Sequence, residues 1–341
     1  MHRGNAVGGD GRRKRRRCGE QAPVHFDRDA STEKACSLIA EAGARGATLA
    51  AFSEAWLPGY PTFAFAPPTP VRWRSGAAHI ACALEIPGPE VARLCAAARK
   101  AKLDVVIGVA EIDPRTKSTV YCTLLFIGRN GEIIGKHRKL KPTFHERTVW
   151  GDGDASGLRV YERPYGRISG LNCWEHQMTL PGYALAMQGT QIHVAAWPGR
   201  EPDPVPAPPA ALWPRQTLLS RAFASQAGAY VIAASAINRK ADFPAEFRDA
   251  VLFEHDGGSC IIDPRGEIIA GPVTGEETIL MAEGQLDLVR AVKSVVDIAG
   301  HYSRPDVFDL RINRACADDR DPASAVRPQD SLVARKTEVL T

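Results

Sequence analysis

Cys173 is the first candidate for chemistry in this sequence of 341 residues. It follows the apolar run 168–171 and precedes Trp174, Glu175 and His176, after which a helical pattern begins. A cysteine at such a strand-to-helix corner is accessible, and backbone N–H groups there lower a thiol pKa and stabilise an oxyanion. The competing interpretation, a buried structural cysteine, is the commoner one for a lone thiol.

A nucleophilic thiol needs a base, which in many enzymes is a histidine. His176 is only three residues from Cys173, which is awkward for an in-line base, and the papain-type pattern around a catalytic cysteine is missing. Cys173, His176 and His193 also form a weak zinc pattern, because a single CxxH without a second ligand pair is not typical of zinc sites. We therefore expect no metal, and other residues must supply the acid–base chemistry.

Glu54 and Lys139 are the other acid–base candidates. Glu54 follows the apolar run 47–52, so we expect it at the carboxyl end of a buried strand. Lys139 lies in the run GKHRKLKPT at 135–143, directly after an expected hairpin. Each residue alone is ordinary, because Glu and Lys are among the commonest surface residues.

Alternating helices and strands must position these groups. The apolar periodicity predicts helices over 31–45, 90–102, 178–187 and 213–227, and strands over 47–52, 104–110, 120–127, 132–136, 167–171, 191–196 and 230–235. Residues 259–270 repeat the strand, turn and Gly-Glu-Ile-Ile pattern of the hairpin at 120–136. The Pro-rich and aromatic segment 58–70 is expected to be a loop. The alternation predicts one α/β or layered α+β domain.

Composition and charge exclude several classes of protein. The chain has 44% hydrophobic and 24% charged residues, as ordinary globular proteins do, and no run of 18 apolar residues that would span a membrane. The first 20 residues contain seven basic and two acidic residues. The whole chain has a net charge of +4, so residues 21–341 carry a net charge of −1. The body of the chain therefore lacks the basic face of a nucleic-acid binder. A nucleic-acid arm at the N-terminus, with an inactive site behind it, is the alternative from another class.

The eight cysteines stand singly and form no CxxC pair. This usage favours free thiols in a reducing compartment. No apolar segment follows the N-terminal arginines, so we expect no secretory signal and a cytoplasmic protein.

Four segments together resemble one family, the nitrilase branch of the carbon–nitrogen hydrolase superfamily. They are FSEAWLPGYP at 52–61, HRKLKPTFHERTVWGDGD at 137–154, GLNCWEHQMTLPGYALAMQGTQIHVAAWPG at 170–199 and GHYSRPDVF at 300–308. The resemblance covers about residues 22–313. It implies an α+β fold, an αββα sandwich that pairs to αββααββα in dimers, and the duplicated hairpin supports that fold independently.

By motif match, the resemblance implies that Glu54 is the general base, Lys139 the cationic catalyst and Cys173 the nucleophile. Glu146 matches the additional carboxylate of the family site, and the backbone N–H of Trp174 is placed to stabilise the developing negative charge. The implied reaction is hydrolysis of an organic nitrile to a carboxylic acid and ammonia, without metal or organic cofactor. The alternatives within the superfamily are an amidase and a cyanide-degrading enzyme, because all share Glu, Lys and Cys.

The sequence says less about substrate and assembly. Tyr60, Trp197 and His176 are candidates for substrate binding, and the aromatic residues near the motifs favour an aryl or arylalkyl nitrile. The family implies a homodimer or a larger spiral homo-oligomer. We expect a carbon–nitrogen hydrolase domain over 21–313, a basic and disordered extension over 1–20, and a polar tail over 314–341 that is a possible oligomer contact.

Two features depart from the family pattern. Residues 12–20, RRKRRRCGE, stand where relatives have an apolar strand, and a central strand is not expected to have that composition. Either that strand is lost, or the start of the polypeptide departs from that of a working relative at a cost to folding or solubility. Ser53 stands where the family commonly has Pro, and we expect a looser strand end before Glu54.

Overall fold

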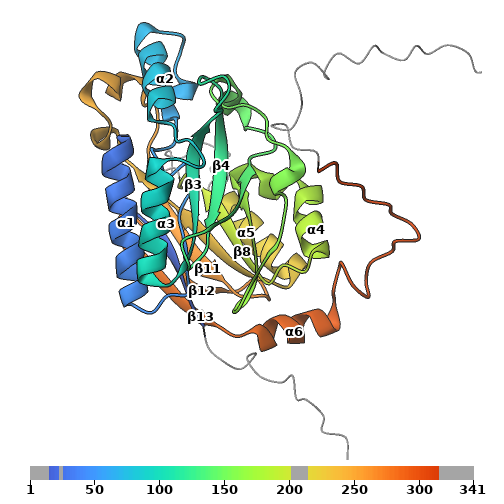
Figure 1. Ribbon diagram of the computed structural model, residues 1–341. Helices are drawn as coiled ribbons and strands as arrows, with labels where there is room; N and C mark the ends of the chain where they lie inside the picture. The colour runs from blue at the N-terminus through green and yellow to red at the C-terminus, as the bar shows by residue number, and fades with distance from the viewer. Residues whose placement is uncertain (1–14, 23–25, 201–213, 315–341) are drawn as a thin grey trace, which may run out of the picture.

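Two β-sheets lie face to face in the computed structural model, which describes residues 15–22, 26–200 and 214–314 (Figure 1). The first sheet has the order β13-β1-β2-β3-β4-β5, and the second has the order β10-β11-β9-β8-β7-β6 with β12 paired to β11. The first contains β1 (Arg15–Gln21), β2 (Leu49–Ala51), β3 (Asp104–Ile112), β4 (Val120–Ile127), β5 (Ile133–Arg138) and β13 (Thr278–Gly284). The second contains β6 (Tyr161–Arg163), β7 (Gly166–Asn172), β8 (Ile192–Trp197), β9 (Tyr230–Ser235), β10 (Ile237–Asn238), β11 (His255–Ile262) and β12 (Ile268–Thr274).

Helices cover the outer face of each sheet (Figure 1). On the first sheet α1 (Arg28–Ala44) and α3 (Pro89–Ala101) lie side by side, and α4 (Thr179–Met187) and α5 (Pro214–Ala227) cover the second. The remaining helices are α2 (Pro70–Cys82) and α6 (Leu286–Val295). The predicted αββα sandwich is confirmed. None of the helices in the described ranges combines the length and apolar character needed to cross a bilayer.

The central strands are apolar on both faces because each face is covered. In β3, Val105 and Ile107 pack toward α1 and α3, whereas Val106 packs with Leu124 and Phe126 between the two sheets. Burial on both sides removes the apolar–polar alternation of a half-exposed strand. The continuous runs of the sequence are thus strands of a four-layer structure.

The N-terminal strand corrects the sequence analysis. Residues 15–21 form β1, which pairs in parallel with β2 and antiparallel with β13. The alternative that this strand is lost is wrong, and β1 occupies the end of the expected extension over 1–20. The remainder of the expected extension, residues 1–14, and the expected tail beyond residue 314 lie outside the described residues.

Polar side chains are tolerated in β1 because they find partners. The Arg17 guanidinium lies 4.4 Å from the centre of the Tyr230 ring. Gln21 accepts a hydrogen bond of 2.9 Å from the backbone N–H of Ser259. Burial raises the pKa of Glu20 to about 8, so its carboxyl group is neutral at pH 7 and accepts a hydrogen bond from the Cys18 thiol at 3.2 Å. The sheet therefore buries a strand whose composition alone predicts exposure.

Candidate active site

Cys173 occupies a sharp corner between β7 and a 3₁₀ turn, Cys173–Gln177. Its φ of +50° lies in the left-handed region that residues other than glycine seldom adopt. Glu175 fixes this corner, because its carboxylate accepts hydrogen bonds from the backbone N–H groups of Asn172 at 2.8 Å and Leu140 at 2.9 Å. It also lies 3.1 Å from Nε2 of His137. Glu175 thereby ties the nucleophile corner to the segment that carries Lys139.

Lys139 lies between two buried carboxylates. Its Nζ is 2.7 Å from Oε1 of Glu54 and 2.7 Å from Oε2 of Glu146. Glu54 follows β2, Lys139 follows β5, and Glu146 lies in the 3₁₀ turn Phe144–Thr148. One carboxylate oxygen of each acid and Sγ of Cys173 lie within 4.8 Å of one another. The four residues that the motifs suggested are therefore brought together, and each is at most 2% exposed.

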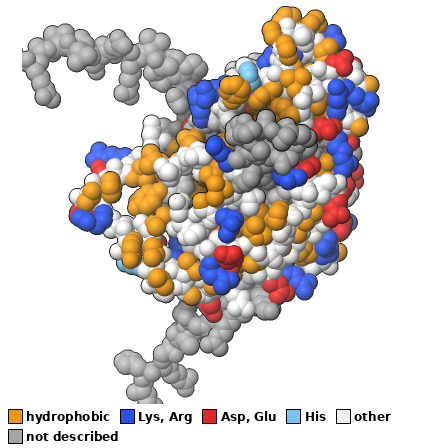
Figure 2. Space-filling view, turned by 180° about the vertical axis from the view of Figure 1, so that it is seen from behind, with side chains coloured by type: hydrophobic (Ala, Val, Ile, Leu, Met, Phe, Trp, Pro, Cys, Tyr) orange, Lys and Arg blue, Asp and Glu red, His pale blue; other side chains and the backbone are white. Residues whose placement is uncertain are grey.

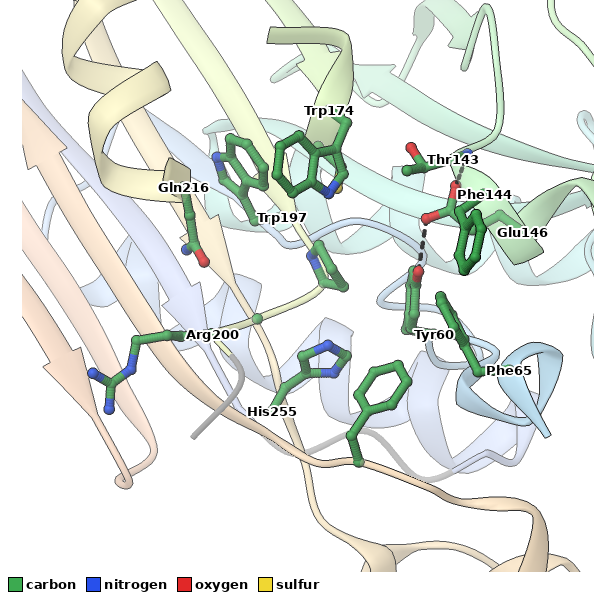
Figure 3. Close-up of a pocket in the computed structure, with 14 residues that line it drawn as sticks. Tyr60, Phe65, Thr143, Phe144, Glu146, Trp174, Trp197, Arg200, Gln216 and His255 are labelled. Atoms are coloured by element: carbon green, nitrogen blue, oxygen red, sulfur yellow. Dashed lines mark hydrogen bonds between the residues drawn. The ribbon is translucent and has the colours of Figure 1, made fainter. Parts of the chain in front are cut away.

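Hydrogen bonds hold the two acids in place. Tyr60 donates to Oε1 of Glu146 at 2.7 Å, and the backbone N–H of Thr143 donates to its Oε2 at 2.6 Å (Figure 3). The segment before Glu54 is fixed by its backbone, since Phe52 donates to Val106 at 2.8 Å and Glu54 to Trp197 at 3.2 Å. These bonds do not involve the side chain of residue 53, so they hold the strand end with serine at that position.

Burial sets the protonation states of the site. Burial and the nearby Glu54 raise the pKa of the Cys173 thiol well above its ordinary value, although the Trp174 backbone N–H opposes the shift. The backbone N–H at the corner thus lowers this pKa as expected, but burial outweighs it. Burial raises the pKa of Glu54 to about 7, against the effect of Lys139. For Lys139 burial alone would lower the pKa, but Glu146 and Glu54 raise it well above the ordinary value.

This charge arrangement suits proton transfer. Lys139 is an ammonium ion, and the neutral thiol lies beside a carboxyl group whose pKa is close to neutrality. Within the described residues, Oε2 of Glu54 has no hydrogen-bond partner although it is buried. A buried carboxylate oxygen is costly to leave unpaired, so a free oxygen on Glu54 fits a base that accepts a proton.

The same residues also offer metal ligands. Glu54, Glu146 and Cys173 supply carboxylate and thiol groups of a kind that bind divalent cations. Here the ammonium group of Lys139 bonds to both carboxylates and supplies the positive charge between them. The arrangement fits acid–base chemistry better than cation binding.

His176 is not on the cavity wall. Its Nδ1 lies 2.7 Å from the Cys173 carbonyl oxygen and its Nε2 lies 2.9 Å from Nε2 of His193. Burial lowers the pKa of His176 to about 4, so the ring is neutral. The His176 ring thus contacts the nucleophile corner and His193, and it is not among the residues that line the cavity. Among the described residues, Cys173, His176 and His193 do not form a metal-ligand cluster.

A cavity of about 270 Å³ opens onto Cys173 and Glu146 (Figure 3). Tyr60 and Trp197, both expected at the substrate site, line it. The other residues that line it are aromatic, polar or small. They are Phe65, Thr143, Phe144, Trp174, Pro198, Gly199, Arg200, Gln216, Phe253 and His255. An organic molecule with an apolar body fits such a lining.

Glu175 and His137 were missed by the sequence analysis, which gave them no role. Two local patterns mark the turns that carry the site. Asn172 with Glu175 and Thr143 with Glu146 each form a capping box, in which the fourth residue bonds back to the first. The spacing in the sequence is thus sufficient to place both turns.

The fold and the buried Glu-Lys-Glu-Cys group together define a thiol hydrolase with an αββα sandwich. The family model for carbon–nitrogen hydrolases matches residues 18–294, and the chain belongs to this family. It is 53% identical over 300 residues to Nitrilase 2 from an unknown prokaryotic organism, covering 87% of this chain and 91% of that protein. It is 36% identical over 298 residues to an aliphatic nitrilase of Rhodococcus rhodochrous, covering 86% and 80%.

Solved structures support the same fold. A carbon–nitrogen hydrolase from Helicobacter pylori superimposes with a TM-score of 0.68 at 18% identity, covering 88% of this chain and 98% of that one. Nit3 of Saccharomyces cerevisiae, a member of the nitrilase superfamily, gives a TM-score of 0.65 at 21% identity, covering 85% and 97%.

Proposed function

We propose that the chain is a nitrilase that hydrolyses an organic nitrile to a carboxylic acid and ammonia. The observation that carries the proposal is the position of Lys139 between Glu54 and Glu146, with Cys173 beside them on the cavity. These groups are common to hydrolases of the family. The 53% identity to a protein named as a nitrilase favours nitriles over amides.

Glu54 acts as a base in more than one step of the reaction. It takes the thiol proton as Cys173 attacks the nitrile carbon, which forms a thioimidate. Lys139 and the Trp174 backbone N–H stabilise the charge that develops on nitrogen. Lys139 gives a proton to that nitrogen and takes the thiol proton from Glu54 along their 2.7 Å hydrogen bond, so Glu54 is again a carboxylate. Water activated by Glu54 then adds, ammonia leaves, and a thioester remains. A second water hydrolyses the thioester and releases the acid.

The cavity supports an aryl or arylalkyl substrate. Its volume of about 270 Å³ is larger than the volume that cyanide needs, because cyanide is close to water in size. Tyr60, Trp197 and Phe253 offer ring faces and edges to an aromatic body.

We expect ammonia and acid to form from phenylacetonitrile and benzonitrile, and much less ammonia from the matching amides. The reason is that the cavity has room for a nitrile and for the matching amide, whereas the 53% identity to a protein named as a nitrilase favours the nitrile. Ammonia release with both sets of compounds measures the difference. Turnover of amides alone would contradict the nitrilase assignment and favour the amidase.

We infer that the chain associates with itself. Leu180 and Met187 of α4 are 63% and 52% exposed, and Val307 and Phe308 of the segment after α6 are 55% and 74% exposed. Leu310 and Ile312 of this segment pack into the cluster that includes α4, so these surfaces adjoin. Figure 2 shows hydrophobic side chains gathered on the side away from α1, whose own side is rich in charged groups.

Exposed apolar groups on adjoining elements are typical of protein contacts. A second copy of the chain fits them, since most soluble oligomers are homo-oligomers. Light scattering at micromolar concentration should give at least the mass of a dimer. Leu180→Glu together with Phe308→Glu should reduce that mass, and a wild-type chain that stays monomeric would contradict the inference.

A cytoplasmic location is also proposed. All seven cysteines in the described ranges are unpaired, which supports a reducing compartment. Cell fractionation tests this, and recovery of the chain outside the cytoplasm would refute it.

A further inference from the structure

His255, the first residue of β11, is a polar group in the cavity wall that the reaction does not use. The residue is 2% exposed. Its ring lies edge-on to Tyr60 and to Phe253, with centroid distances of 5.4 Å in both cases. Tyr60 donates to Glu146, so one aromatic ring separates His255 from the catalytic acids. Figure 3 shows the imidazole ring directed into the cavity between these groups.

The contacts of Asn238 fix the tautomer of this imidazole. The carbonyl oxygen of Pro198 lies 3.1 Å from the Asn238 side chain and only accepts, so it faces the NH₂ group. The same NH₂ group lies 3.1 Å from Nδ1 of His255 and donates to it. Burial lowers the pKa of His255 to about 3, and the ring is therefore neutral. Its one proton resides on Nε2.

Nε2–H of His255 has no acceptor among the described residues. Nε2 itself is not fully enclosed, so this N–H faces the open cavity. A ligand that covers it without accepting its hydrogen bond leaves it unpaired, at a cost of about 1–3 kcal/mol, whereas an apolar ring in the same wall would impose no such cost. The donor therefore suggests a bound acceptor in the cavity. Arg200 lines the same cavity and makes hydrogen bonds of 3.0 and 2.6 Å with Asp256, so its charge is matched. A neutral acceptor fits this environment better than a carboxylate.

We propose that His255 is a specificity-determining residue, which donates a hydrogen bond from Nε2 to a neutral acceptor on the part of the substrate remote from the nitrile carbon. The substrate class is an aryl or arylalkyl nitrile that carries an ether, hydroxyl or carbonyl oxygen. This inference rests on the proposed nitrilase function, and it adds a hydrogen bond to the apolar contacts that bind the substrate. Such a contact is the same in the ground and transition states, so it affects KM more than kcat.

The test compares methoxyphenylacetonitriles with methylphenylacetonitriles substituted at the same ring position. We expect the wild type to prefer the methoxy compound at one of the three positions. In His255→Phe, which keeps a flat ring without the donor, kcat/KM for that compound should fall by about tenfold, as one hydrogen bond allows, and mainly through KM. The value for the methyl compound should change by less than about twofold.

Two further variants separate recognition from packing. His255→Gln, which retains an N–H donor, should restore part of the preference. Phe253→Leu, which removes the neighbouring ring and no donor, should change both compounds alike. An unchanged methoxy-to-methyl ratio in His255→Phe would overturn the proposal, as would a cavity in which His255 bonds only to water.

The outcome is distinguishable from failure of the nitrilase assignment. If the wild type acts on amides and on no nitrile, the assignment fails, and the same ratio with the matching amides still decides the role of His255. Dissociation constants of the paired nitriles with the Cys173→Ala protein give a second ratio that requires no turnover. Loss of the methoxy preference in that ratio on His255→Phe supports the proposal, and its persistence refutes it.

Discussion

Replacement of Cys173 by alanine is expected to abolish turnover and to leave the fold intact. The change removes one sulfur atom at the cavity wall, and the corner around it is fixed by Glu175. Cys173→Ser should be nearly inactive, because burial and Glu54 already disfavour the thiolate and a hydroxyl is much harder to deprotonate. Ammonia release measures activity, and circular dichroism with thermal unfolding measures the fold.

Mass spectrometry tests the nucleophile directly. A slow nitrile should leave a covalent adduct on Cys173 and on none of the other seven cysteines. Cys260 is the matched control, because it is also buried and packs in the same apolar cluster, and Cys260→Ala should retain activity. An adduct on another cysteine, or full activity in Cys173→Ala, would contradict the mechanism.

Glu54→Gln and Lys139→Ala should each reduce kcat/KM by at least ~100-fold, the low end for positioned acid–base and charge-stabilising groups. The glutamine variant cannot accept the thiol proton. The alanine variant removes the ammonium between two buried carboxylates, so it should also lower the thermal unfolding temperature. Steady-state kinetics and thermal unfolding separate the two effects.

The pH dependence of the wild-type kcat/KM should also report the role of Glu54 as the base. Burial raises the pKa of Glu54 to about 7, and only the ionised carboxylate accepts a proton. The kcat/KM should therefore fall as the pH decreases below about 7. Lys141, which is exposed and paired with Asp152, is the control, and Lys141→Ala should keep activity and profile. Activity that is constant from pH 5 to 8 would exclude Glu54 as the base.

The sequence predicts those elements of the fold whose own residue pattern matches their burial in the structure. The strands predicted at 104–110 and 120–127 correspond to β3 and β4, whose runs are apolar because both faces are buried. The sequence analysis did not predict α2, α6, β13 or the short strands β6 and β10. Most side chains of β13 are partly exposed and few are buried, so the strand shows only a weak pattern of apolar residues in the sequence. Strand β1 escaped because partners distant in the sequence, such as Tyr230 and Ser259, neutralise or satisfy its polar side chains.

The candidate site shows a similar division. Cys173 is suggested by its place at the end of an apolar run, but Glu54 and Lys139 are ordinary until the motifs are considered together. Their contact depends on three different strand ends meeting at one place, which local sequence does not encode. The local sequence indicates the backbone N–H that lowers the pKa of Cys173, but not the burial by the whole fold, which outweighs it.

The pairing of β1 with β13 has a consequence for the order of folding. Arg15 pairs with Gly284, so β1 completes its sheet only with β13, the first and last strands of the described ranges. A ribosome makes the N-terminal strand first, and one edge of β1 then stays open until residue 284 has emerged. Open strand edges are sites of aggregation. Closure of the first sheet is therefore a late step, and a chain released before β13 retains an open edge that favours aggregation.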